Sequence, residues 1–308
     1  MNKTKMIFCR VMSACCLMLL FPVIVLADTG VGLALSPEFR RPLFYSQNIE
    51  VREDQDADRP GFGKRAFRDL SGAVKITLSD VKHIYTAPAR MDVRHALWLG
   101  GILAVGGVIF AYDQEIYDAL KRNEDHKFYK PIRDAGEFFE PLGYMGFTNK
   151  FLFAALAIGY VARIEPMIEI PCDVLEHFLV ASFGKNTMMV LAGRKGPMIE
   201  EGPRSRTFND GRSFPSGHSL AITQLASVLS HHTDYVPLKV AAYGMAGTVL
   251  LQRITSDHHW PSDVYGGAFF GWLVSRELLK RKEERNIKIT PVTWDGEKGA
   301  GLMVTFGF

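Results

Sequence analysis

A series of apolar stretches with helical spacing runs through the middle of the chain, and almost no alternating, strand-like pattern lies between them. The stretches occupy residues 96–112, 147–162, 174–191, 220–230, 238–251 and 264–279, and residues 73–85 carry a further helical pattern. Helices with one apolar face bury that face against one another. This order therefore predicts an all-α fold, a helical bundle of about six main helices.

The last twenty or so residues have a different character. Residues 287–293 and 301–306 read as two short strands around the turn signal Asp295-Gly296. Two strands cannot close a barrel, so we expect residues 286–308 to form a short C-terminal β-hairpin on the surface of the bundle.

The N-terminus reads as an export signal. Lys3, Lys5 and Arg10 flank the start of an apolar run at residues 11–26, and a small residue, Ala27, stands where cleavage would occur. Residues 1–27 are thus predicted to be a signal peptide, with an uncleaved anchor helix as the alternative. Residues 28–70 are predicted to be irregular, and residues 71–285 to form the helical domain. The expected location is the periplasm or the cell envelope.

Composition limits the partners. A net charge of +3 is too small for a nucleic-acid-binding protein, so no nucleic acid is expected. Three of the four cysteines lie in the predicted signal peptide, so cleavage would leave Cys172 alone, as an expected buried side chain without a disulfide. Only residues 96–112 approach the roughly 20 apolar residues of a membrane span. We therefore expect a bundle that does not cross the bilayer, although the sequence leaves attachment to a membrane surface open.

Two short motifs carry groups suited to phosphate chemistry. Pro215-Ser216-Gly217-His218 stands directly before a predicted helix, where backbone N–H groups and the helix dipole favour an anion. Residues 252–263 read QRITSDHHWPSD and precede another helix. This second stretch supplies a cation, an imidazole and a carboxylate four residues beyond the imidazole: Arg253, His259 and Asp263. Both motifs fall at junctions that an up-and-down bundle brings to the same end, so we expect one site.

With these motifs the chain resembles the type-2 phosphatidic acid phosphatase/haloperoxidase superfamily, over about residues 73–279. The second family motif is complete at residues 215–218, and the third matches at Arg253, His259 and Asp263, with Gln252 where serine is usual. The first motif departs from the pattern, because Met189 and Gly196 stand where the family has lysine and arginine. Other cations could replace them: Arg194, Lys195, Lys185, Arg204, Arg206 and Arg212.

The resemblance implies a mechanism without a metal or other cofactor. His259 would attack phosphorus and form a phosphohistidine, Asp263 would hold the imidazole in the correct tautomer, and His218 would protonate the leaving oxygen. Four residues would bind the phosphate oxygens: Arg253, Arg194, Ser216 and Gly217. The implied enzyme is an exported phosphatase, acting on a phosphomonoester or diphosphate that the apolar helices suggest is a lipid phosphate rather than a small soluble phosphoester.

The sequence also allows three other interpretations of the same residues. The same pocket could hold vanadate and act as a haloperoxidase, which vanadate-dependent halide oxidation would reveal. The altered first motif could mark a non-catalytic envelope protein that binds anionic headgroups. The histidines and aspartates of residues 257–263, together with His231 and His232, could bind a metal, although few acidic ligands are present.

Overall fold

The structure is a computed structural model that describes residues 62–162, 164, 166–198, 211–294 and 299–306, with side chains described from residue 74 to residue 285. The predicted signal peptide and residues 28–61 of the predicted irregular segment lie outside the described residues, as do Arg204 and Arg206. Helix begins at Phe62, inside the range that was expected to be irregular.

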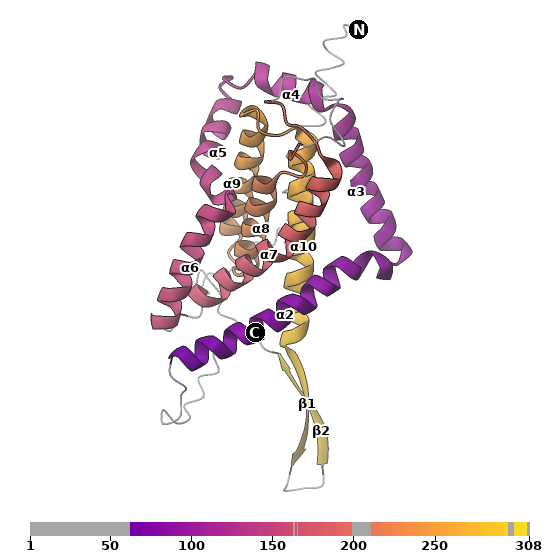
Figure 1. The fold of residues 1–308 in the computed structure, drawn as a ribbon. Coiled ribbons are helices and arrows are strands. Elements are labelled where there is room, and N and C mark those ends of the chain that lie inside the picture. The colour runs from indigo at the N-terminus through magenta and orange to yellow at the C-terminus, as the bar shows by residue number, and fades with distance from the viewer. Residues whose placement is uncertain (1–61, 163, 165, 199–210, 295–298, 307–308) are drawn as a thin grey trace.

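Within the described residues the chain forms nine α-helices and one short 3-10 helix, which confirms the all-α class (Figure 1). They are α2 (Phe62–Thr86), η1 (Ala87–Arg90), α3 (Val93–Ala111), α4 (Asp113–Arg122), α5 (Tyr129–Gly143), α6 (Met145–Ala162), α7 (Pro166–Ala192), α8 (Gly217–His231), α9 (Val236–Thr255) and α10 (Pro261–Asn286).

The number of helices differs from the expected six. Each of the six predicted stretches overlaps a helix, but α4 and α5 were not predicted. Charged residues dominate α4, whose buried apolar side chains are only Ile116 and Leu120. Pro141 interrupts the pattern near the end of α5. Both helices form because their few apolar residues meet the rest of the bundle, a tertiary effect that local patterns underestimate.

The core is built around α8, which packs against α5, α7, α9 and α10. Most side chains of α8 are buried, and its apolar residues join those of the surrounding helices in one cluster that includes Val174, Ile222, Val249 and Trp272. At Gly271 the two helices α8 and α10 approach so closely that a Cβ would lie 2.6 Å from the backbone oxygen of Leu220. The helix that carries His218 is therefore fixed on all sides.

Two helices lie across the ends of the bundle. In Figure 1, α4 crosses the upper end and α2 crosses the lower end. A cluster of Ile109, Ile116, Leu120, Ile254 and Val264 joins α4 to the ends of α3, α9 and α10. The upper end is also where α7 and α9 end and where α8 and α10 begin, so α4 covers the helix junctions that carry both motifs.

Two apolar helices are largely exposed. Val93–Ala111 and Met145–Ala162 are long and apolar enough to cross a membrane, and only 6% and 17% of their apolar windows are buried. The prediction that only residues 96–112 approach a span, and that the other apolar runs are core helices, is therefore wrong for α6. Side chains such as Leu97, Leu103, Phe153 and Val161 lie on the outside, where a soluble core helix would face its neighbours. Cys172 is exposed, not buried as expected.

The chain ends in two antiparallel strands, β1 (Ile287–Trp294) and β2 (Gly299–Phe306), which continue from α10. Ile287 pairs with Phe306, and Trp294 pairs with Gly299. In Figure 1 the strands extend away from the lower end of the bundle, opposite the helix junctions described above.

Candidate active site

Backbone hydrogen bonds join the two sequence motifs. Ser216 is the N-cap of α8, and its hydroxyl accepts a hydrogen bond from the backbone N–H of Ser219 at 3.3 Å. The backbone N–H of Ser216 donates to the backbone oxygen of Asp263 in the first turn of α10, at 3.0 Å. Gly267 lets α10 lie against the backbone of Ser216, because a Cβ there would collide with it. The starts of α8 and α10 are thus fixed side by side.

His259 has a defined tautomer. Its Nδ1 lies 2.9 Å from the backbone oxygen of Ser213, which can only accept a hydrogen bond. Nδ1 therefore carries the proton, and Nε2 keeps its lone pair. The backbone N–H of His259 donates to the backbone oxygen of Arg253 at 3.2 Å, which fixes the loop from α9. The imidazole is prepared to act as a nucleophile through Nε2.

Asp263 does not contact His259 directly, which corrects the expected arrangement. The hydroxyl of Ser213 lies between them: it donates to Asp263 Oδ2 at 2.6 Å and lies 3.2 Å from His259 Nδ1. Asp263 Oδ2 also accepts the backbone N–H of Trp260 at 3.0 Å. The carboxylate caps the start of α10, and it reaches the imidazole only through Ser213. Asp263 is thus a positioning residue.

Arg194 is also placed differently from the prediction. Its side chain is only 2% exposed, and each terminal nitrogen is held by a carboxylate: Nη1 donates to Asp263 Oδ1 and Nη2 to Asp113 Oδ2, both at 2.6 Å. Nη1 also donates to Ser262 Oγ at 2.6 Å. The guanidinium is enclosed further by the rings of Phe110 and Trp260. Both terminal nitrogens of Arg194 are therefore held by buried carboxylates, while its Nε is buried without a hydrogen-bond partner among the described residues. The side chain clamps the starts of α4 and α10 together.

Asp113 is a site residue that sequence reasoning missed. It is 1% exposed at the start of α4, and its Oδ1 accepts the backbone N–H of Ser262 in the first turn of α10 at 2.8 Å. Its Oδ2 accepts from Arg194 and from the Ser262 hydroxyl. Burial raises the pKa of Asp113, against the opposing effect of Arg194. Because Asp113 lies 149 residues before Ser262, only the packing of α4 on the bundle reveals this role.

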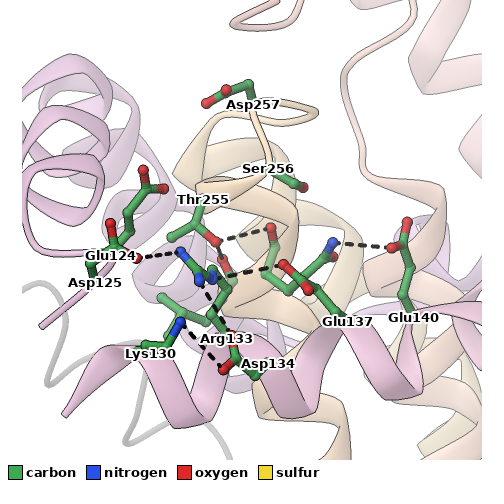
Figure 2. Close-up of polar contacts among 12 residues, drawn as sticks. Glu124, Asp125, Lys130, Arg133, Asp134, Glu137, Glu140, Thr255, Ser256 and Asp257 are labelled. Atoms are coloured by element: carbon green, nitrogen blue, oxygen red, sulfur yellow. Dashed lines mark hydrogen bonds and ion pairs between the residues drawn. The ribbon is translucent and has the colours of Figure 1, made fainter. Parts of the chain in front are cut away.

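Arg253 lies in the last turn of α9, buried beside both histidines. Its Nη1 pairs with Glu140 of α5, and Gln252 Nε2 donates to the other oxygen of that carboxylate at 3.1 Å. Figure 2 shows Glu140 reaching from α5 towards the end of α9, on the same helix as Arg133, Asp134 and Glu137. Arg253 Nε is buried without a partner among the described residues. Part of its binding capacity is therefore unused.

His218 lies in the first turn of α8, stacked against the ring of Tyr144 at a centroid distance of 6.1 Å. Gly143 ends α5 so close to His218 that a Cβ would lie 3.3 Å from its Cδ2. Burial and the charge of Arg253 lower the pKa of His218 to about 4, against an opposing effect of Glu140. His218 is therefore neutral at neutral pH until an anion binds nearby.

The other ionisable groups are perturbed by burial as well. Burial, together with positive charge on Arg253 and His218, lowers the pKa of His259 to about 3. The charge effect of His218 on His259 indicates that the two imidazoles lie in the same part of the structure. Burial raises the pKa of Asp263 to about 6 in spite of Arg194. Perturbed groups that share a site are typical of catalysis.

The other cations that could replace those missing from the first motif lie at different distances from the start of α8. Lys185 approaches Gly217 at the start of α8, with Nζ 3.8 Å from the position of a Cβ on that glycine. Gly196 instead packs against the backbone of His258, and Lys195 accepts the indole N–H of Trp260 on its backbone oxygen. Arg212 is exposed.

The residues of the metal interpretation do not come together. His258 is exposed and lies 2.9 Å from the Ser256 hydroxyl. His231 and His232 lie at the other end of α8, about 20 Å along the helix from His218, and His232 contacts Asp173. Among the described residues no group of three or more His, Cys, Asp or Glu side chains is arranged to hold a metal ion.

The protein is an all-α bundle. Its two motif loops place a pair of histidines and an arginine at adjoining helix ends. A sequence model of the PAP2 superfamily matches residues 171–287, from α7 to the end of α10. The resemblance found in the motifs is thereby confirmed for this stretch of the chain.

No curated protein matched the chain. Among solved structures, the chain is similar to the crystal structure of a transmembrane PAP2-type phosphatidylglycerolphosphate phosphatase from Bacillus subtilis. The sequences are 17% identical, the match covers 60% of this chain and 95% of that one, and the TM-score is 0.45.

Proposed function

We propose that this protein is an exported, membrane-associated phosphatase that hydrolyses a phosphomonoester or diphosphate of a lipid through a phosphohistidine, without a metal. The observation that carries the proposal is the hydrogen bond from His259 Nδ1 to the backbone oxygen of Ser213. That bond leaves the lone pair of Nε2 available for attack on phosphorus.

In the first half-reaction, Nε2 of His259 forms a bond to phosphorus while the bond from phosphorus to the leaving oxygen breaks. His218, protonated once the substrate's negative charge is beside it, gives its proton to the leaving alcohol or phosphate. His259 gains positive charge, which the backbone oxygen of Ser213 and the Asp263 carboxylate behind Ser213 stabilise.

In the second half-reaction, water attacks the phosphohistidine. His218, now neutral, takes a proton from the water as the new phosphorus–oxygen bond forms and the bond to Nε2 breaks. Phosphate leaves, and both imidazoles return to their starting states. Arg253 and the backbone N–H groups at the start of α8 bind the equatorial oxygens in both steps. Stabilising the negative charge on these oxygens accounts for most of the catalysis of phosphoryl transfer.

The exposed apolar helices support a lipid substrate. α3 ends at the upper end of the bundle, and α6 begins just after Gly143, which packs against His218. Tyr144, which stacks on His218, is 60% exposed just before the first residue of α6. A bilayer that covers α3 and α6 would therefore hold a phosphorylated lipid with its headgroup level with the histidines.

The test is release of phosphate from a panel that includes phosphatidic acid, an isoprenyl diphosphate and a soluble aryl phosphate, with His259→Ala as the control. We expect activity on lipid phosphates in the presence of a chelator, and none in the variant. Labelled substrate should leave an acid-labile, base-stable phosphoryl group on the wild type after rapid quenching. If wild type and variant are equally inert on every substrate, the phosphatase assignment fails.

The same assay separates the other functions considered. Halide oxidation that depends on added vanadate would indicate a haloperoxidase. Binding of vesicles with anionic headgroups, without any turnover, would indicate a binding protein. Export is tested by fusing residues 1–27 to a reporter that is active only outside the cytoplasm.

A further inference from the structure

The site described above has few cations that are free to meet a phosphate. Arg194 is neutralised by Asp113 and Asp263, and Arg253 shares its charge with Glu140. A phosphomonoester carries up to two negative charges. The family positions that would supply more cations hold Met189 and Gly196. The bound phosphate therefore needs another positive group.

Lys185 of α7 is in the right place to supply that charge. Its Nζ lies 3.8 Å from the position that a Cβ would occupy on Gly217, the first residue of α8. The first N–H groups of a helix have no intrahelical partner and favour an anion. Lys185 also lies one turn before Met189 on the same face of α7, so a long side chain can cover the place of the missing lysine.

The surroundings of Lys185 provide a second, independent indication. Within the described part of the chain, no carboxylate forms an ion pair with it, whereas both arginines of the site have such partners. Its side chain is half-buried, and burial lowers the pKa of Lys185 without an opposing contribution from a neighbouring acid. A partly desolvated ammonium without a negative partner is stabilised when an anion binds.

We propose that Lys185 binds the non-bridging oxygens of the substrate phosphate, in place of the cation missing at Met189, and that it does so together with Arg253 and the start of α8. This inference rests on the proposed phosphatase function. It assigns phosphate recognition to Lys185 and Arg253, and it leaves Arg194 with a structural role only.

The test compares Lys185→Met, Lys185→Arg and the matched control Lys150→Met. Lys150 is an exposed lysine on α6, where the same exchange removes a charge away from the site. Each variant is assayed for kcat, KM, melting temperature and inhibition by orthovanadate and inorganic phosphate. For Lys185→Met we expect an unchanged melting temperature, a fall of about 10²-fold in kcat/KM and a rise of at least about tenfold in the inhibition constants.

Lys185→Arg should recover most of the loss, and Lys150→Met should equal the wild type. If Lys185→Met matches the wild type while His259→Ala is inactive, the role of Lys185 is wrong and the phosphatase function stands. If the wild type has no activity but binds orthovanadate, and Lys185→Met does not, the anion site stands and the phosphatase function fails. If the wild type neither turns over nor binds orthovanadate, both proposals fail.

Discussion

Ser213 holds the imidazole of His259, the proposed nucleophile, in two ways: through its backbone oxygen and through a hydroxyl that leads to Asp263. Ser213→Ala keeps the backbone contact and loses only the hydroxyl. We expect kcat to fall by about tenfold, the value of one neutral hydrogen bond. Asp263→Asn should lower kcat by a larger factor than Ser213→Ala, because it also weakens the ion pair with Arg194. Equal losses in phosphate release for the two variants would contradict this order.

Arg194 separates two buried carboxylates, and its removal leaves them facing each other without a cation. Arg194→Met should lower the free energy of unfolding by about 3–5 kcal/mol, as expected when one partner of a buried ion pair is removed. Denaturant unfolding of the variant measures the change, with Arg212→Met as an exposed control. A stable variant with weaker orthovanadate binding would mean that Arg194 binds phosphate after all.

The two histidines predict an unusual pH dependence. His259 must be neutral and His218 protonated, and their pKa values in the empty site are about 3 and about 4. As the pH rises through the pKa of His218, the free enzyme loses its general acid, so kcat/KM should fall as the pH rises above about 4. A bound phosphate raises the pKa of His218, so the alkaline limb of kcat should lie at higher pH. Coincident limbs would contradict the role of His218.

The exposed apolar faces of α3 and α6 are the basis for the hypothesis that the protein associates with a membrane. Replacing Leu97, Leu103 and Val161 by glutamine removes apolar surface that is more than half exposed in each case. We expect the wild type to sediment with phospholipid vesicles and the triple variant to bind at least tenfold less. Leu78→Gln, a similarly exposed leucine on α2, serves as the control. Equal sedimentation of all three proteins would show that these faces do not contact lipid.

The sequence predicted the elements that have strong periodic patterns and missed those that tertiary contacts stabilise. Helical spacing located the stretches of α7 to α10, and the motifs located the two histidines. The contacts between motifs could not be predicted in the same way. Asp113 and Glu140 come from α4 and α5, whose packing no local pattern reveals, and Ser213 lies outside the family motifs. Spacing alone placed Asp263 against His259, because it could not show that Ser213 lies between them.

For the whole molecule, buried histidines predict loss of stability in acid. Burial lowers the pKa of His177, His218 and His231 to about 4 and of His259 to about 3, against about 6.5 in the unfolded chain. Below pH 6.5 these histidines are protonated in the unfolded chain but remain neutral in the folded chain. The free energy of unfolding therefore decreases as the pH falls towards 4.

Three acids act in the opposite direction. The pKa of Asp113 is raised, that of Asp263 is raised to about 6 and that of Glu176 to about 7, so all three bind protons more tightly in the folded chain. Four histidines against three acids leave a net loss of stability, on the order of 1–3 kcal/mol between pH 7 and pH 5. Denaturant unfolding at the two pH values measures it, and His177→Gln should reduce it. Greater stability at pH 5 would contradict the prediction.

The clamp made by Asp113 has a consequence for how this protein can be divided. The stretch that matches the superfamily begins at residue 171, yet the carboxylate that holds Arg194 and the first turn of α10 comes from α4. Glu140 and Tyr144, which contact Arg253 and His218, also precede that stretch. A fragment that starts at residue 171, or a chimaera joined there to a foreign N-terminal half, would contain both motifs but lack Asp113, Glu140 and Tyr144, which hold the motif residues in place. The shortest fragment that keeps these contacts therefore begins before Asp113.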